Sequence, residues 1–261
     1  IAVNMELMQG SLAQHARLRR AHVRDHALSY ALDCVKGLAH LHASGIMHRD
    51  VKLQNMLVGN DGVTCKVGDL GSARLYIPGR EYTVCATTLH FRSLEMLYGC
   101  SRYDMSVDVW SVACTFYELL NGSMLFPSDG TMVDQIVVIA EALGSPSPST
   151  WPGVDALPYY SPCFPSPAWK PPVDRHVLFR LQANIMDTPP FWTKLLRRCL
   201  CSPAQRSSME TILHLMQDEL QRQLGLNDDR DVDYEYDVMY GSDNDREVIE
   251  GSLALRASDK T

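Results

Sequence analysis

The stretch HRDVKLQN, residues 48–55, gathers polar side chains that can handle protons, metals and phosphates within eight positions. Asp50 can accept a proton from a hydroxyl group, and Lys52 can neutralise charge on a transferring phosphate. Asn55 and, further along the chain, Asp69 offer the oxygen ligands that Mg²⁺ prefers. One Asp or Asn alone usually caps a turn, but the joint pattern predicts a site for phosphoryl transfer, which depends on positioning and charge neutralisation.

The composition fits a globular protein, because 46% of the 261 residues are hydrophobic, enough for one large domain or two small ones. No run approaches eighteen apolar residues, and the first ten residues lack the basic region of a secretory signal. The chain begins without Met, so we expect a piece of a longer product. Eight cysteines without a C-x-x-C pair predict reduced, buried thiols in a cytoplasmic or nuclear protein, rather than disulfides or zinc.

The net charge of −7 comes from the C-terminal end, where residues 226–261 carry eleven acidic and four basic side chains. This acidic tail has no sustained periodicity and is expected to be disordered. We interpret it as a solvated extension, with the binding of a basic partner as the less favoured alternative. The rest of the chain is neutral and shows no basic face, so neither nucleic-acid nor membrane binding is expected.

Apolar spacing predicts a mainly α-helical fold with a few short β-strands. The predicted helices span 23–43, 107–120, 132–143, 191–200 and 208–220, and the last begins with a capping box at Ser207 and Glu210. The predicted strands span 1–8, 46–47, 56–58 and 65–67, and the turn GNDG at 59–62 joins the last two as a hairpin. Most of the prolines lie in 145–190, which predicts an ordered loop there.

HRDVKLQN resembles the catalytic loop of protein kinases, and DLG at 69–71 resembles their Asp-Phe-Gly motif, with Leu70 in place of Phe. This resemblance implies that Asp50 is the catalytic base and that Lys52 contacts the γ-phosphate of ATP. It implies that Asn55 and Asp69 hold Mg²⁺. Lys52, two residues after Asp50, is typical of serine/threonine kinases, so the implied activity is ATP-dependent phosphorylation of a protein substrate.

The resemblance extends from Val3 to Leu220 and is closest to the cyclin-dependent branch of the group that also holds the mitogen-activated kinases. It rests on three further segments: YTVCATTLHFRSLEMLYG at 82–99, the stretch from SVDVW at 106–110 to WPGV at 151–154, and CLCSPAQRSS at 199–208. A protein substrate is implied, and a cyclin-like regulatory subunit is left open. The departures from the family pattern are Ser11, His90, Leu94 and Ala113.

The resemblance also assigns regulatory and structural residues. Thr83 lies where cyclin-dependent kinases carry their activating threonine, and a phosphate there would pair with Arg49. Glu95 and Arg206 are expected to form a buried ion pair, because the family joins these two positions. Asp108, in SVDVW, is given a structural role.

The chain has no G-x-G-x-x-G, and its first lysine is Lys36. The resemblance therefore implies that the N-terminal lobe is largely absent, with a hinge at 1–12, the large lobe at 13–225 and the tail at 226–261. It places Met5 as gatekeeper, Glu6 and Met8 at the hinge that contacts adenine, and Leu57 as the floor of the adenine pocket. We expect this chain alone to be inactive. The alternatives are a docking scaffold without turnover and, less favoured, a small-molecule phosphotransferase.

Overall fold

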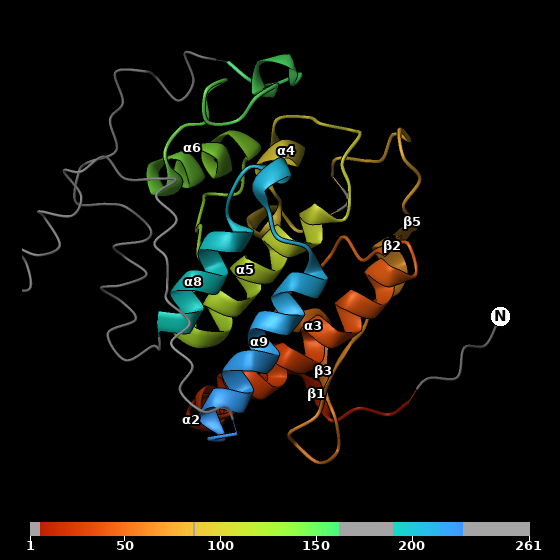
Figure 1. Ribbon diagram of the computed structural model, residues 1–261, viewed down its shortest axis with the longest axis vertical. Coiled ribbons are helices and arrows are strands. Elements are labelled where there is room, and N and C mark those ends of the chain that lie inside the picture. The colour runs from red at the N-terminus through yellow and green to blue at the C-terminus, as the bar shows by residue number, and fades with distance from the viewer. Residues whose placement is uncertain (1–5, 86, 162–189, 227–261) are drawn as a thin grey trace, which may run out of the picture. The chain divides into compact units, whose positions relative to one another are not determined.

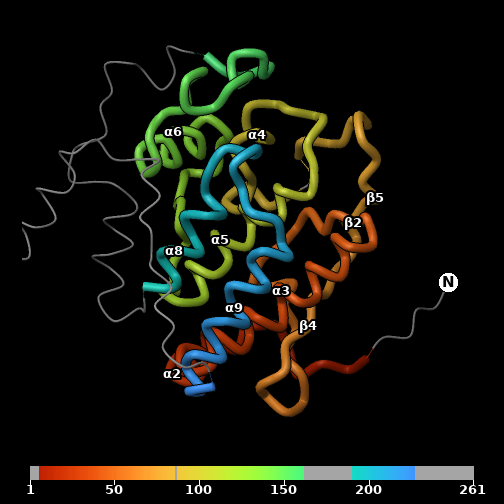
Figure 2. Tube along the Cα trace, in the orientation of Figure 1, coloured from red at the N-terminus to blue at the C-terminus, as the bar shows by residue number. Residues whose placement is uncertain are grey.

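The helix α3, Ala27–Ala43, lies at the centre of the fold. Tyr30, Cys34 and Leu38 recur at intervals of four residues and are fully buried, which is the spacing of one helix face. The helix packs against α9, Met209–Gln223, and against the strand β4, Cys65–Val67 (Figures 1 and 2). Segments far apart in the sequence therefore share one core.

The computed structural model describes residues 6–85, 87–161 and 190–226. Two units divide the chain, Ile1–Leu224 and Gly225–Thr261, and all but two of the described residues belong to the first. The predicted acidic tail lies outside the described residues, apart from Leu226. No helix in the described ranges is long and apolar enough to cross a membrane.

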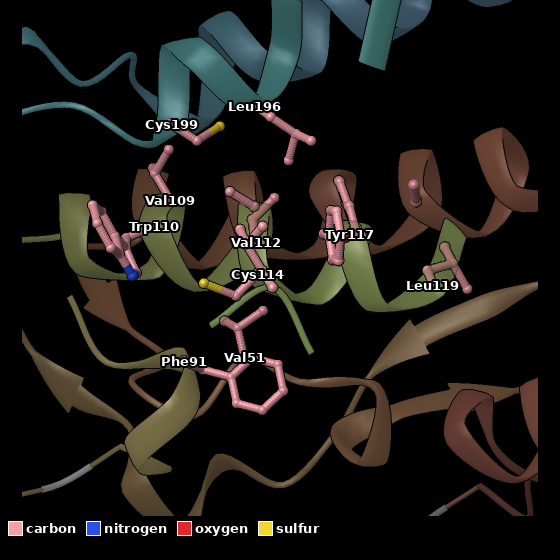
Figure 3. Close-up of a cluster of buried hydrophobic side chains, with 14 of the residues drawn as sticks. Val51, Phe91, Val109, Trp110, Val112, Cys114, Tyr117, Leu119, Leu196 and Cys199 are labelled. Carbon is pink, nitrogen blue, oxygen red and sulfur yellow. The ribbon is translucent and has the colours of Figure 1, made fainter. Parts of the chain in front are cut away.

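The helix α5, Ser106–Asn121, is buried on nearly all sides. Figure 3 shows its Val112 and Cys114 between Val51 on one side and Leu196 of α8, Pro190–Cys199, on the other. A helix that is apolar all round belongs inside a core. It ends at Gly122, whose φ of 73° is the left-handed conformation that closes helices.

The remaining helices of the described ranges are shorter than α3 and α5. They are α1 (Leu12–Leu18), α2 (Arg20–Asp25), α4 (Leu94–Leu97) and α6 (Met132–Leu143), with short 3-10 turns at η1 (Leu53–Asn55), η2 (Leu70–Ser72), η3 (Leu89–Phe91), η4 (Val154–Ala156) and η6 (Pro203–Gln205). The predicted helices at 107–120, 132–143 and 191–200 are confirmed to within one residue at each end.

Two small antiparallel sheets carry the strands. β1 (Gly10–Ser11), β3 (Met56–Val58) and β4 pair in the order β1-β3-β4, and β2 (Ile46–Met47) pairs with β5 (Arg74–Leu75). The predicted hairpin is confirmed, with Met56 opposite Val67 and Val58 opposite Cys65. It brings the residues after HRDVKLQN beside those before Asp69.

Three predictions about elements are wrong. The predicted helix 23–43 breaks at His26, where α2 ends; α3 begins at Ala27, and α2 packs against α5 as well as α3. Residues 6–8 form no strand, and Gly10–Ser11 pairs with β3 instead. Ser208, not Ser207, caps α9, because its hydroxyl accepts the N–H of Thr211. Residues 1–5 lie outside the described part.

The other predictions on loops and thiols are partly confirmed. Of the predicted proline-rich loop, the described part, 145–161, has no helix beyond the short turn η4. The seven cysteines in the described ranges are free, and Cys34, Cys65, Cys114 and Cys199 are buried. Cys85 is exposed, contrary to prediction, because its segment forms a loop rather than a core element.

Candidate active site

Asp108 anchors the catalytic-loop segment from inside the core. Its fully buried carboxylate accepts the backbone N–H of His48 at 2.8 Å, that of Arg49 at 2.7 Å and the Nε2 of His42 at 2.9 Å. Hydrogen bonds to an ionised carboxylate are stronger than hydrogen bonds between neutral groups, and Asp108 accepts three of them. They fix the backbone immediately before Asp50.

The anchored backbone is strained at two positions. Arg49 has a φ of 66° and Asp69 a φ of 56°, and in the ranges that the structure describes they are the non-glycine residues with positive φ. Such conformations persist only where surrounding contacts hold them, and they gather at functional sites. Both lie beside candidate catalytic residues.

Asp50 is the centre of a polar cluster. Its Oδ2 lies 2.7 Å from the Nζ of Lys52, and the Nδ2 of Asn55 donates to the same oxygen at 3.0 Å and to the Asp50 carbonyl at 2.8 Å. Thr88 donates its hydroxyl to Asp50 Oδ1 at 2.8 Å and accepts from Lys52 at 2.9 Å. The structure therefore brings Asp50, Lys52 and Asn55 together.

These contacts set the ionisation of Asp50. Partial burial acts to raise its pKa, but the hydrogen bonds from Lys52 and Thr88 and the charge of Lys52 outweigh burial, so the pKa is lowered. Asp50 is therefore ionised near neutral pH. An ionised carboxylate can accept the proton of a substrate hydroxyl and orient its oxygen.

Asp69 is joined to this cluster through its neighbour Gly68. The Gly68 N–H donates to the Asn55 carbonyl at 2.8 Å, and the Gly68 carbonyl accepts from His48 Nε2 at 3.0 Å. A Cβ on Gly68 would lie 2.7 Å from Leu57 Cδ1, so the close approach needs glycine. The Asp69 side chain itself is exposed and accepts the N–H of Gly71 at 3.2 Å.

The donor set fits a hard cation. Asn55 uses its amide nitrogen towards Asp50, which leaves its Oδ1 as the atom that a cation would meet. Asp69 adds an exposed carboxylate, and one or two such oxygens suit Mg²⁺ carried by phosphates. Asn55 and Asp69 could hold Mg²⁺ in this way.

The predicted adenine-contacting residues lie at the three-stranded sheet. Glu6 Oε2 forms an exposed ion pair with Lys66 of β4 at 2.6 Å, and the carbonyl of Leu7 accepts from Asn60 at 3.3 Å. Met8 is half-buried, and Leu57 lies in β3 against Gly68. Met5 lies outside the described residues.

Tyr103 joins the two predicted regulatory residues. Arg49 Nη1 donates to the Tyr103 hydroxyl at 2.9 Å, and that hydroxyl donates to the carbonyl of Thr83 at 2.8 Å. Arg49 also donates to the carbonyl of Ser72 at 2.8 Å. Thr83 is exposed, whereas the Tyr103 side chain is buried. Sequence reasoning missed Tyr103, since no local pattern marks its partners.

Glu95 and Arg206 form a buried ion pair. The guanidinium reaches both carboxylate oxygens, at 2.6 and 3.1 Å, and donates to the carbonyls of Ser106 and Cys201. It also lies over the ring of Trp110, 5.3 Å from its centroid. This pair connects α4 to α5 and to the segment that leads into α9. The Thr88 segment lies just before α4.

Thr88 is a second residue that sequence reasoning missed. Its signal was present, because Thr88 occupies the threonine of the family's Thr-x-x-Tyr-Arg pattern in the segment quoted above. The adjacent Thr87 is held by Arg92, which is buried and donates to its carbonyl at 2.7 Å.

Comparisons with known proteins agree with this geometry. The family model described as "Protein kinase domain" matches residues 1–216. Cyclin-dependent kinase 20 of Rattus norvegicus and that of Mus musculus are each 40% identical over 159 residues, which cover 60% of this chain and 45% of the relative. The chain thus spans about half the length of these curated relatives.

Two solved structures have the same fold. The yeast RNA Pol II CTD kinase CTDK-1 complex matches with a TM-score of 0.70 and 25% identity, covering 80% of this chain and 67% of that chain. The CAK complex from Chaetomium thermophilum bound to ATP-gamma-S matches with a TM-score of 0.69 and 29% identity, covering 80% and 64%.

The family model begins to match at residue 1, so it does not confirm that the N-terminal lobe is largely absent, and that stays a prediction. The fold, the loop around Asp50 and the matched family lead to one conclusion. The chain belongs to the protein kinase family, and its similarity is to cyclin-dependent kinases.

Proposed function

We propose that this chain carries the catalytic residues of an ATP-dependent serine/threonine protein kinase. One observation carries the proposal: the ionised Asp50 carboxylate is held between Lys52, Asn55 and Thr88 on an anchored loop. Few reactions other than phosphoryl transfer need a base, a cation and a metal-ligating amide so close together. The ATP analogue named with the CAK complex supports ATP as the donor.

Each residue has a distinct role in this proposal. Asp50 orients the attacking hydroxyl and accepts its proton, while Lys52 neutralises charge near the γ-phosphate. Asn55 and Asp69 hold Mg²⁺, which would neutralise the charge of the phosphates when bound. Lys52 also donates a hydrogen bond to Thr88. We assign serine/threonine specificity from this contact and from the position of Lys52, two residues after Asp50.

Partners and regulation belong to the same proposal. We propose a protein substrate and leave room for a regulatory protein subunit, since both matched structures are described as complexes. Phosphorylated Thr83 would attract Arg49, which already reaches the Thr83 backbone through Tyr103. Thr83→Ala is expected to lower phosphate transfer about tenfold or more, because alanine cannot be phosphorylated and the contact with Arg49 is lost. Unchanged phosphate transfer after Thr83→Ala, measured in a longer, active form of the protein, would remove Thr83 from the proposal.

A docking scaffold without turnover is the second candidate. It is favoured by the lack of a G-x-G-x-x-G among the 261 residues, since backbone N–H groups of such a loop position the phosphates. We therefore expect the 261-residue chain alone to transfer phosphate far more slowly than kinases ordinarily do.

The deciding experiment compares two proteins, the 261-residue chain and a longer one that includes the residues encoded upstream of Ile1. Transfer of radiolabelled γ-phosphate to a protein substrate is measured with and without Asp50→Asn. Asp218→Asn, an exposed position on α9, is the matched control. We expect transfer by the longer protein, a loss of about 10²–10⁴-fold in Asp50→Asn, and no change in the control.

The outcomes separate the candidates. Transfer by the longer protein that survives Asp50→Asn would refute the proposed role of Asp50. No transfer, together with ATP binding below detection and stable capture of a partner, would favour the scaffold.

A further inference from the structure

Cys34 and Cys65 form a buried thiol pair that the proposed kinase chemistry does not use. Cys34 lies in α3 and Cys65 begins β4, and both side chains are almost fully inaccessible to solvent. The Cys34 thiol donates a hydrogen bond to the sulfur of Cys65, with 3.5 Å between the two sulfur atoms. Both cysteines are free.

The backbones on either side hold the pair in register. Asp33, next to Cys34, accepts the backbone N–H of Cys65 at 3.2 Å. Further along α3, a Cβ on Gly37 would lie 3.0 Å from Val67 Cγ2, so the glycine lets the helix and the strand approach closely. Figure 2 shows β4 running beside α3. A disulfide needs about 2 Å between sulfurs, so the sulfurs must approach by about 1.5 Å.

One of the two cysteines borders an open hollow. Cys65 lines an open hollow of about 250 Å³ between α3 and the β4–η2 segment, together with Gly37, Leu41, Val67 and Leu70. Cys34 is not part of this lining. We therefore assign the first oxidation to Cys65, the residue beside the hollow, and the second step to Cys34.

We propose that Cys34 and Cys65 are a reversible redox site, at which a peroxide forms a disulfide between α3 and β4. The Cys65 sulfur attacks one oxygen of hydrogen peroxide, so an S–O bond forms, the O–O bond breaks and one water leaves. The Cys34 sulfur then attacks the Cys65 sulfenic acid, so the S–S bond forms, the S–O bond breaks and a second water leaves. The two sulfurs lose two electrons, one peroxide gains them, and the thiol protons leave in the waters.

The environment of Cys34 controls the rate of the second step. Its hydrogen bond to Cys65 and its burial raise the pKa of the Cys34 thiol, so little thiolate is present near neutral pH. Disulfide formation is therefore slow at neutral pH and accelerates as pH rises. The crosslink would act on the strand that leads to Gly68, which is bonded to Asn55 and His48. The proposal does not depend on kinase activity.

The test uses the intact 261-residue chain. It is treated with a few equivalents of hydrogen peroxide, the remaining thiols are alkylated in denaturant, and the peptides are mapped by mass spectrometry. We expect a peptide pair joining Cys34 to Cys65 with the loss of two hydrogens, which a dithiol reverses. Cys34→Ser and Cys65→Ser each abolish it, and Cys85→Ser, at an exposed position, leaves it unchanged.

The map of the unaltered chain decides the proposal even where a serine variant fails to fold. Full alkylation of Cys34 and Cys65 after peroxide, with oxidation confined to Cys85, Cys100 or Cys201, would overturn the proposal. So would oxidation of Cys65 to sulfinic acid without a disulfide. Faster disulfide formation at higher pH supports attack by thiolates, whereas a rate that falls as pH rises contradicts it.

Discussion

Two ion pairs in this molecule have similar lengths and opposite surroundings. Glu95 and Arg206 meet at 2.6 Å with side chains 5% and 1% exposed, and the guanidinium also bonds backbone carbonyls. Asp50 and Lys52 meet at 2.7 Å with side chains 14% and 20% exposed. The first pair is almost fully enclosed and holds elements together, whereas the second is only partly buried.

The comparison separates stability from chemistry. Removing one member of an enclosed pair leaves a charge that water cannot reach, so the folded state loses much of its stability. Removing one member of a half-open pair leaves a charge that water can reach, so stability changes little. The rate of phosphate transfer should show the opposite pattern, falling more when the Asp50–Lys52 pair is changed than when the Glu95–Arg206 pair is changed. The predictions below vary burial while the chemistry of the pair stays similar.

The largest expected loss of stability follows Arg206→Ala. The change strands the Glu95 carboxylate among buried groups and removes contacts to Ser106, Cys201 and the Trp110 ring. We expect the free energy of unfolding to fall by about 3–5 kcal/mol. Arg206→Lys should recover only part of it, because an ammonium cannot bond both carboxylate oxygens in parallel. Urea unfolding followed by circular dichroism measures both values.

The matched control for this prediction is the exposed pair between Glu81 and Arg102, joined at 3.1 Å. Glu81→Gln should cost less than about 1 kcal/mol. Equal losses in Glu81→Gln and Arg206→Ala would show that burial does not distinguish the pairs, and the comparison would fail.

The next largest loss is expected from Asp108→Asn. Asparagine keeps one acceptor oxygen, but its NH₂ group would face N–H donors of His48, Arg49 or His42. A buried donor left without an acceptor costs about 1–3 kcal/mol, so we expect a loss of that size in urea unfolding.

Asp104→Asn is the control for Asp108→Asn, because Asp104 is exposed and accepts the N–H of Ser106 near the start of the same helix. The side-chain oxygen of asparagine can accept the same N–H two residues on, so the control should be near neutral. A loss in Asp104→Asn as large as in Asp108→Asn would mean that the start of α5, not the loop anchor, is what the mutation disturbs.

The sequence was sufficient for elements and residues whose signal is local. The long helices follow from apolar spacing, and the β3–β4 hairpin follows from the turn GNDG between two short apolar runs. Asp50, Lys52 and Asn55 are close because the loop that joins them is short. The break at His26 was not predictable, because it depends on where α2 and α3 pack rather than on apolar spacing.

Contacts between distant segments were the part that sequence could not supply. Tyr103 bonds Arg49 and the Thr83 backbone, and Cys34 meets Cys65 across 31 positions of sequence. Local pattern identifies neither set of partners, since the first contact joins three loop segments and the second depends on the packing of α3 against β4. The reciprocal cap between Ser11 and Gln14 is different: it was readable from the sequence and was overlooked.

A smaller change in stability, with a distinct pH dependence, is expected from Asp50→Asn. Because folding lowers the pKa of Asp50 below its usual 3.8, the unfolded chain binds the proton more readily. The stabilising contribution is therefore complete above the unfolded pKa and is lost as pH falls through the folded pKa. We expect the difference between the parent chain and Asp50→Asn to be about 1 kcal/mol or less near neutral pH and to vanish at strongly acidic pH.

Urea unfolding at several pH values measures this difference. Asp218→Asn, exposed on α9, is the control and should show no such trend. A difference that grows as pH falls would contradict the sign of the pKa shift and with it the assignment of Asp50 as an ionised base.

The smallest expected effect is at the exposed pair between Glu6 and Lys66, whose side chains are 62% and 52% exposed despite a separation of 2.6 Å. Holding two flexible side chains together in water costs entropy that nearly cancels their attraction, so Glu6→Gln should change the free energy of unfolding by less than about 1 kcal/mol. Salt screens such exposed charges over about 10 Å at 0.1 M, so raising the salt concentration should remove the difference. Urea unfolding of the parent chain and of Glu6→Gln, at low and at high salt, measures both expectations. If Glu6→Gln were as costly as Arg206→Ala, or if its cost persisted in high salt, then the segment before β1 would contribute to the core. The contrast between enclosed and exposed pairs would then have to be drawn elsewhere in the molecule.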